Sequence, residues 1–324
     1  MTASHANDPL DRRIEHAMSL LGPLAERDVP LAPLTTYRVG GPATILVRPR
    51  CLEDLHVVAD AVGATGLAPL IVGRGSNLLV ADAGFAGIAI SLTEMSSEHR
   101  FEGCAQVVAG SMVALPQLAR RVVAASLTGF EWAVGVPGSI GGAVRMNAGG
   151  HGSDIAACLV EALVFDLRTR RSGWLPADRL GLRFRGSDLA SHQVIVEARL
   201  QLAAGDRESS ERELNEIVRW RRERQPGGQN AGSVFVNPIP GELAAGELID
   251  RVGLRGMQLR TASVSDKHAN FIQGSDGGRA ADVLELIELV RARVAEQTGF
   301  VLRSEVRLVG FDGVANDESP GVQV

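Results

Sequence analysis

The chain has 324 residues, of which 45% are hydrophobic and 22% charged, and its formal net charge is -5. This composition is typical of a globular protein that is long enough for two or three hydrophobic cores. The acidic balance argues against a broad nucleic-acid-binding surface, and no apolar run approaches the ~20 residues that a membrane span needs. The polar N-terminal stretch has no apolar signal segment, so we expect a cytoplasmic protein without membrane or nucleic-acid partners.

The positions of the cysteines and histidines argue against a disulfide-stabilised protein and against a metal-binding protein. Cys51, Cys104 and Cys158 lie far apart in the sequence, which suits neither a disulfide framework nor a zinc cluster. The seven histidines show no ligand spacing, so we expect no metal. Lys267 is the single lysine of the chain, and retention of one lysine among many arginines draws attention to its position.

In chain order, residues 8–26 predict a leading helix, with Asp8 as its N-cap and Pro9 in its first turn. Strand and helix patterns then alternate, which favours an α+β fold. The predicted strands are 44–47, 70–72, 88–92, 107–109, 160–166, 194–202 and 301–309, and the predicted helices are 52–62, 115–126, 211–224 and 282–297. The polar residues 205–209 indicate a boundary, and the tail from 312 is expected to be disordered.

Two glycine-rich segments carry the first functional signal. Gly73-Arg74-Gly75-Ser76-Asn77 follows a predicted strand, and a second segment runs from Gly135 to Gly149. Glycines allow positive φ angles and let a ligand approach main-chain N–H groups, and such concave N–H groups bind pyrophosphate. A Rossmann fingerprint fails on spacing because Leu78 stands where glycine or alanine is required, and no P-loop lysine is present. The first segment alone could be a simple tight turn, whereas two such segments favour a phosphate site.

The order of several motifs resembles one enzyme family. Thr35-Thr36-Tyr37-Arg38-Val39-Gly40-Gly41 precedes the two glycine segments, and Phe184-Arg185-Gly186-Ser187, Ala231 to Pro238, Lys267 to Phe271 and Ser304 to Arg307 follow. This order, over about residues 31–310, resembles the UDP-N-acetylenolpyruvoylglucosamine reductases of peptidoglycan precursor synthesis. The short stretch between Asn237 and Lys267 is similar to the compact form of the family, which lacks a tyrosine-bearing loop.

The resemblance implies an α+β fold with an FAD-binding domain of the vanillyl-alcohol-oxidase (PCMH) type in two subdomains and a C-terminal α+β substrate-binding domain. The expected divisions are a helical extension (1–30), the FAD-binding domain (31–205, with subdomains of about 31–100 and 101–205), the substrate-binding domain (206–310) and a disordered tail (311–324). The resemblance further implies that NADPH reduces a non-covalent FAD, which then reduces UDP-N-acetylglucosamine enolpyruvate to UDP-N-acetylmuramate. We expect a monomer.

This reaction adds a hydride and a proton across a double bond conjugated to a carboxylate. By resemblance, Arg185 binds that carboxylate as charge develops on it, Ser233 supplies the proton, and Glu305 stabilises the enolate. Pattern alone also allows ordinary roles for these residues, namely a surface arginine, a turn serine after Gly232, and a strand glutamate paired with Arg307.

The ligand contacts that the resemblance implies are more numerous. For FAD they are Tyr37, Arg38, Val39, Gly40, Gly73, Arg74, Gly75, Ser76, Asn77, Leu78, Gly135, Val136, Pro137, Gly138, Ser139, Gly141, Gly142, Ala143, Asn147, Gly149 and Ile195. For the substrate they are Arg224, Asn237, Lys267 and His268, although His268 could equally be a structural histidine. Phe184, Arg145 and His151 depart from the tyrosines that are frequent in relatives.

Two other functions remain open from the sequence. A different flavin oxidase or dehydrogenase with the same FAD domains would have no shared cleft for Ser233 and Glu305. A non-catalytic flavin-binding or nucleotide-sugar-binding regulator would bind FAD that NADPH does not reduce.

Overall fold

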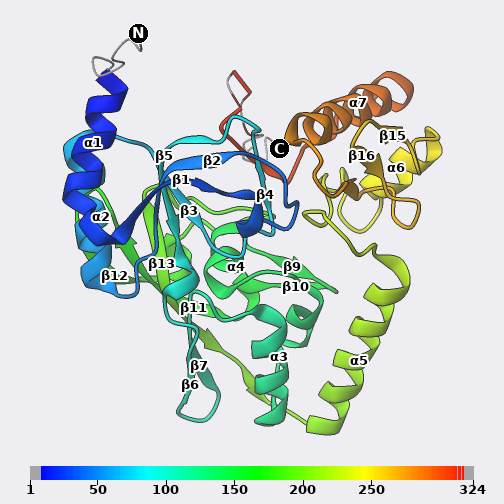
Figure 1. Ribbon diagram of the computed structural model, residues 1–324. Coiled ribbons are helices and arrows are strands. Elements are labelled where there is room, and N and C mark those ends of the chain that lie inside the picture. The colour runs from blue at the N-terminus through cyan, green and yellow to red at the C-terminus, as the bar shows by residue number, and fades with distance from the viewer. Residues whose placement is uncertain (1–8, 312, 315, 317–324) are drawn as a thin grey trace. The chain divides into compact units, whose positions relative to one another are not determined.

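The computed structural model describes residues 9–311, 313, 314 and 316 (Figure 1). Internal contacts divide the chain into two compact units, each assembled from separated stretches. Among the described residues, unit 1 takes those of Met1–Val29, Ala43–Arg74 and Ala86–Asn215, and unit 2 takes those of Pro30–Pro42, Gly75–Phe85 and Glu216–Val324. The predicted divisions near residues 30, 100 and 205 stay predictions. The expected N-cap Asp8 and most of the expected disordered tail lie outside the described residues.

Unit 1 contains two larger sheets and four α-helices. Its helices are α1 (Pro9–Leu21), α2 (Leu52–Thr65), α3 (Leu115–Ala124) and α4 (Ile140–Met146). Its four-stranded sheet has the order β1 (Ala25–Pro30), β2 (Pro42–Val47), β5 (Phe85–Ser91) and β3 (Pro69–Val72). Its five-stranded sheet has the order β12 (Arg171–Pro176), β11 (Leu159–Asp166), β13 (Gln193–Gln201), β7 (Gln106–Gly110) and β6 (His99–Glu102).

Three short strand pairs lie outside the larger sheets. They are β8 (Leu127–Thr128) with β14 (Ala203–Ala204), β9 (Gly149–Gly150) with β10 (Ser153–Asp154), and β4 (Leu78–Val80) with β18 (Arg307–Val309).

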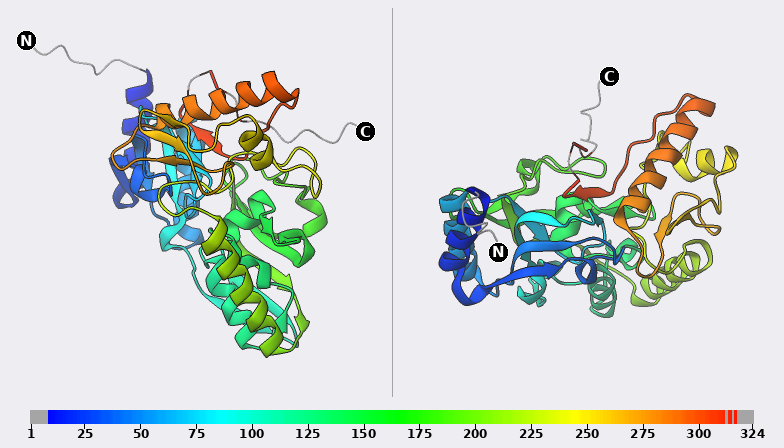
Figure 2. Two further views of the ribbon diagram at one scale, coloured as in Figure 1. Left: turned by 90° about the vertical axis from the view of Figure 1, so that its right-hand side faces the viewer. Right: turned by 45° about the horizontal axis from the view of Figure 1, so that its top comes forward.

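Helices α1 and α2 lie side by side in every view (Figures 1 and 2). The apolar stripe of α1, Ile14, Ala17 and Leu21, joins Leu55 and Val58 of α2 in one buried cluster with the four-stranded sheet. Gly66 ends α2 in a left-handed conformation, with φ 63°, and its N–H caps the helix at the carbonyl of Val62. The leading helix is therefore held by apolar burial, as its spacing predicts.

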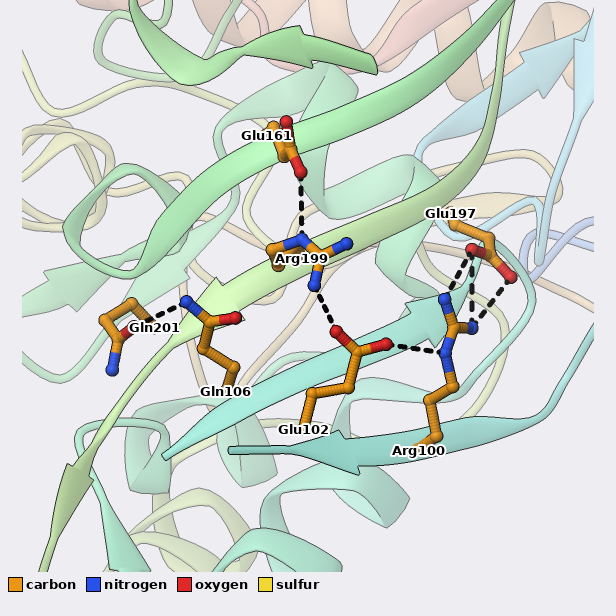
Figure 3. A network of polar contacts seen from close by, with 7 residues as sticks. All are labelled: Arg100, Glu102, Gln106, Glu161, Glu197, Arg199 and Gln201. Carbon is orange, nitrogen blue, oxygen red and sulfur yellow. Dashed lines mark hydrogen bonds and ion pairs between the residues drawn. The ribbon is translucent and has the colours of Figure 1, made fainter. Parts of the chain in front are cut away.

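A charged network lies across one face of the five-stranded sheet (Figure 3). Arg199 of β13 donates to Glu161 at 2.8 Å and also bonds Glu102, and its guanidinium lies 5.2 Å from the Trp174 ring centroid. Arg100 of β6 donates to Glu102 at 2.8 Å and pairs with Glu197. Oppositely charged side chains on neighbouring strands support the strand register. Val108 of β7 pairs with Arg199 on one side and with Arg100 on the other, and it is fully buried beneath this network.

Helix α5 (Arg207–Arg224) begins in unit 1 and ends in unit 2. It starts within residues 205–209, because the Asp206 carboxylate accepts the Ser209 N–H at 2.8 Å and so acts as an N-cap. The sequence-based prediction that this helix starts at residue 211 was wrong by four residues. The buried Glu131 carboxylate also accepts the Ser210 hydroxyl at 2.6 Å, which ties the first turn of α5 to unit 1.

Unit 2 is an α+β unit with a core of its own. An antiparallel sheet of β15 (Gln258–Leu259), β16 (Ala262–Val264) and β17 (Ile272–Gly274) lies against α7 (Ala280–Thr298), and α6 (Ala245–Arg251) packs beside α7 (Figures 1 and 2). The stripe predicted for α7, Val283, Leu286, Ile287, Val290 and Val294, is buried in this core. Asp82 caps α7 by accepting the N–H groups of Ala280 and Ala281.

Most predicted elements are present, with different ends. The leading helix ends at Leu21, and residues 25–30 form β1 instead of helix. The predicted strand 301–309 is reduced to β18, since only an isolated bridge at Ser304 precedes it. Within the described residues, no helix is long and apolar enough to cross a membrane.

Candidate active site

The first glycine segment contributes to both units. Gly73 and Arg74 belong to unit 1, and Gly75, Ser76 and Asn77 belong to unit 2. Gly75 has φ 61°, and a Cβ there would lie 2.0 Å from the carbonyl oxygen of Leu34. The Gly75 carbonyl accepts the Thr36 N–H at 3.2 Å. Glycine is therefore required at position 75 because the chain of residues 34–36 packs directly against it, a reason independent of any ligand.

Gly73, in contrast, faces the second glycine segment. A Cβ on Gly73 would lie 3.3 Å from the Ser139 hydroxyl oxygen, and one on Gly142 would lie 3.8 Å from the same atom. Ser139 is the N-cap residue of α4, but its side chain makes no capping hydrogen bond. The structure thus brings the two glycine segments together within unit 1, around a serine hydroxyl that the helix does not use.

The remaining residues predicted to bind FAD from the second segment surround α4. Gly135, Val136, Pro137 and Gly138 lead into the helix, Gly138 with φ 146°, and Ala143 is buried within it. Gly141 packs on Ser111, where a Cβ would lie 3.0 Å from the Ser111 Cβ. Ile195 is buried on β13, and Gly149 begins β9.

Residues 37–40 lie in unit 2. The Tyr37 and Val39 side chains are buried in the core of unit 2, where burial raises the pKa of the Tyr37 phenol. Arg38 has φ 52°, and its N–H donates to the Thr35 hydroxyl at 3.1 Å. Gly40 sits against Val80, whose carbonyl oxygen would lie 2.4 Å from an added Cβ. For Tyr37 and Val39, the main chain is therefore what a ligand could contact.

Asn77 links the first glycine segment to the C-terminal part of the chain. Its side-chain amide donates to the Glu305 carbonyl at 2.8 Å, and its own carbonyl accepts the Arg307 N–H at 2.9 Å. Leu78 then pairs with Arg307 where β4 and β18 run parallel. The main chain at Glu305 is consequently fixed by the glycine segment.

The main-chain segments that follow Ser233 and contain Glu305 form a strand-like pairing in unit 2. The Glu305 N–H donates to the Val234 carbonyl at 2.7 Å, and Phe235 bridges Ser304. Both side chains are partly buried. Arg185, the third predicted catalytic residue, belongs to unit 1.

Sequence reasoning missed the role of Asn270. Its side chain accepts the Phe235 N–H at 2.9 Å and donates to the Phe235 carbonyl at 2.8 Å, and its carbonyl accepts the Val234 N–H at 2.8 Å. Asn270 therefore makes the hydrogen bonds to Val234 and Phe235 that a neighbouring strand would otherwise make, next to Ser233. A buried asparagine in the conspicuous block Lys267 to Phe271 was the available signal.

The predicted substrate residues have different surroundings, all in unit 2. Arg224 is exposed in the last turn of α5, and the Lys267 ammonium donates to the Arg222 carbonyl at that same helix end. Asn237 is exposed, and its side-chain oxygen accepts the Ala245 N–H at 3.1 Å, so it caps α6. His268 accepts the Asn270 N–H on Nδ1 at 3.2 Å, and burial lowers its pKa, with Arg255 adding to the effect. His268 is therefore neutral at pH 7, the state expected of a structural histidine.

The residues present fit an FAD pyrophosphate. Gly73 and Gly142 lie close to the Ser139 hydroxyl and have no side chains to cover it. The hydroxyl and the main-chain N–H groups are neutral donors, which suit phosphate oxygens. No cluster of three metal-ligating side chains occurs in the described part of the chain.

Comparisons with known proteins identify the family. The family model for an FAD binding domain matches residues 43–168, and that for the UDP-N-acetylenolpyruvoylglucosamine reductase C-terminal domain matches residues 224–309. A reductase of that name from Heliobacterium modesticaldum is 41% identical over 88% of this chain and 90% of its own length. The chain belongs to the UDP-N-acetylenolpyruvoylglucosamine reductase family.

Other relatives extend this result. The reductase of Bacillus subtilis is 37% identical over 89% of this chain and 97% of its own. The solved structure of the Thermus caldophilus reductase has a TM-score of 0.75 and 34% identity, and it covers 88% of this chain and 98% of that one. The predicted fold class and FAD as the cofactor are thereby confirmed, and the chain is an FAD-dependent oxidoreductase.

Proposed function

We propose that this protein reduces UDP-N-acetylglucosamine enolpyruvate to UDP-N-acetylmuramate with NADPH as reductant, in the cytoplasmic phase of bacterial peptidoglycan synthesis. The relatives at 36–41% identity carry the name of this reductase. The observation that carries the proposal is the pairing of the Ser233 and Glu305 segments, with Asn77 of the first glycine segment bonded to Glu305. This arrangement joins the predicted proton donor, the predicted enolate stabiliser and a flavin-binding segment in one unit.

When bound, without a covalent bond, FAD would supply hydride chemistry at the vinyl carbon of the substrate. The Arg185 guanidinium binds the substrate carboxylate through its planar fork of N–H donors. Negative charge develops on that carboxylate as the double bond is reduced, and a fixed cation stabilises it.

Ser233 delivers the proton to the carbon that bears the carboxylate. A serine hydroxyl is a weak acid, so this transfer requires a strongly basic carbon and a fixed position for the hydroxyl. The main chain beside Ser233 is held on one side by Asn270 and on the other by Ser304 and Glu305. Glu305, in its protonated form, donates a hydrogen bond to the enolate.

Lys267 and Arg224 are proposed to bind the UDP diphosphate. The Lys267 ammonium and the Arg224 side chain belong to the same region at the C-terminal end of α5. Two cations there suit a diphosphate, and Asn237 and His268 stay predicted substrate contacts.

The decisive experiment follows NADPH oxidation by the purified yellow protein with and without UDP-N-acetylglucosamine enolpyruvate. We expect oxidation that depends on the sugar nucleotide and yields UDP-N-acetylmuramate. Turnover independent of the sugar nucleotide indicates a different flavin oxidase or dehydrogenase, and bound FAD that NADPH does not reduce indicates a binding protein. Release of free FAD by acid precipitation tests the absence of a covalent bond.

A Ser233→Ala variant tests the proton donor. NADPH should still reduce its flavin, and product formation should fall by about a hundredfold or more. Loss of flavin reduction in this variant contradicts the proposed role of Ser233.

A further inference from the structure

Arg185 stands at the tip of a tight turn in a conformation that non-glycine residues seldom adopt. Its φ angle is 59°, and the turn is closed by Arg183 and Gly186, whose N–H groups and carbonyls bond each other at 2.9 and 3.0 Å. Such backbone conformations persist where the surroundings determine them, and they are frequent at functional sites. The contacts of this turn therefore decide where the Arg185 guanidinium is presented.

Asn147 holds the N-terminal side of the turn. It ends α4 with φ 40°, and its side-chain amide donates to the Arg183 carbonyl at 3.1 Å and to Asp154 at 3.0 Å. Its side-chain oxygen accepts the Ala156 N–H at 3.0 Å. Asn147 is buried, so its polar atoms are committed to the protein.

Arg145 holds the C-terminal side of the same turn. Its guanidinium donates to the carbonyls of Leu189 at 3.1 Å and Ala190 at 3.3 Å, and it also bonds the Gln193 carbonyl. Its own carbonyl accepts the Ser187 hydroxyl at 2.6 Å. The planar guanidinium has five N–H donors in a fixed geometry and holds three carbonyls at once, whereas a tyrosine has one donor and the three donors of a lysine converge on a single nitrogen.

We propose that Arg145 and Asn147 are positioning residues that fix the Arg185 turn to α4, the helix of the second glycine segment. The two residues are separated by a single residue on the chain, yet they hold residues on opposite sides of Arg185. Because α4 also carries the glycines that meet Gly73, the carboxylate-binding arginine and the flavin-binding backbone share one rigid support in unit 1. This inference rests on the proposed role of Arg185.

Arg145 gives the cleaner test, because it is not among the residues predicted to bind FAD. In the full-length flavoprotein, Arg145→Met should leave FAD content and flavin reduction by NADPH unchanged. Reoxidation of the reduced flavin by UDP-N-acetylglucosamine enolpyruvate should slow by about tenfold to a hundredfold, because a displaced arginine no longer meets the carboxylate. Arg145→Lys should give an intermediate loss. Arg171→Met, at an exposed arginine of β12, is the matched control and should change neither half-reaction.

Hydrogen exchange provides a readout that does not depend on turnover. The Gly186 and Asp188 amides, which donate within this loop, should exchange faster in Arg145→Met than in Arg171→Met. Unchanged exchange together with unchanged reoxidation overturns the proposal. If Arg145→Met cannot be isolated with FAD, Arg145→Lys decides by the same two measurements.

A double variant separates this inference from the proposed function. Arg145→Met added to Arg185→Met should cause no further loss of reoxidation rate, since both act through one contact. Fully active Arg185→Met refutes the proposed role of Arg185. Inactive Arg185→Met beside fully active Arg145→Met leaves that role intact and refutes the positioning role of Arg145.

Discussion

The Asn77 amide donates a hydrogen bond to the Glu305 carbonyl at 2.8 Å, which joins residues 228 positions apart. Asn77 comes from the first glycine segment and Glu305 from the segment that pairs with Ser233. The Asn77 side chain therefore links the predicted flavin-binding loop to the main chain of Glu305, a predicted acid of the reaction. Substitution of Asn77 should accordingly affect the reaction.

Asn77→Asp replaces the amide donor with a carboxylate oxygen that repels the Glu305 carbonyl. We expect flavin reoxidation by the enolpyruvyl substrate to fall roughly tenfold, equivalent to about 1.4 kcal/mol. Stopped-flow measurement of both half-reactions checks this. Asn215→Asp on the exposed face of α5 is the control for the added charge, and equal rates in the two variants would contradict the coupling.

Asn270→Asp should destabilise unit 2 and reduce product formation. The exchange keeps the acceptor for the Phe235 N–H but places an oxygen against the Phe235 carbonyl, where the amide donated at 2.8 Å. We expect a loss of about 1–3 kcal/mol in the free energy of unfolding, which urea titration measures. A variant as stable and as active as the parent would show that the Ser233 segment does not need this clamp.

Gly75 and Gly103 form a matched pair for the packing of the first glycine segment. Both have positive φ, 61° and 56°, but a Cβ at Gly75 meets the Leu34 carbonyl, whereas one at Gly103 meets nothing within 4 Å. Gly103→Ala should cost about 1 kcal/mol, the backbone penalty alone. Gly75→Ala should cost at least about 3 kcal/mol in the same denaturation assay, and similar losses would refute the steric explanation.

His268 should make stability depend on pH below neutrality. Its pKa is lowered mainly by burial, so the unfolded chain binds a proton more readily than the folded chain does. Stability is therefore present above the ordinary histidine pKa of about 6.5 and is lost as the pH falls through the lower folded value. In His268→Asn, the side-chain oxygen can still accept the Asn270 N–H and does not titrate.

Thermal denaturation at pH values from roughly 7.5 to 5.0, a range that includes the ordinary histidine pKa, tests this expectation. The parent protein should lose more Tm across that range than His268→Asn does. Identical slopes would exclude His268 as a source of the acid sensitivity.

Local features were predictable from the sequence because neighbouring residues encode them. The apolar stripes of α1 and α7 and the amphipathic pattern of residues 52–62 predicted these helices, although α2 continues to Thr65. The element ends were less accurate, since the N-cap of α5 is the side chain of Asp206 within a stretch that reads as a polar boundary.

The identity of the candidate site was also within reach of the sequence. The order of the glycine segments and of the motifs at Arg185, Ser233 and Glu305 indicated the reductase family, and the comparisons confirm it. The roles of these three residues stay predictions, together with the individual ligand contacts.

The sequence by itself determined the fold class, the FAD cofactor and the family, because these depend on residue types in a fixed order. Only the tertiary structure decided which hydrogen-bond partner each polar side chain has. It assigns Asn77 to Glu305, Asn270 to Phe235, and Arg145 to the turn of Arg185. Buried hydrogen-bond donors must find partners, and those partners are chosen by the packing of distant segments.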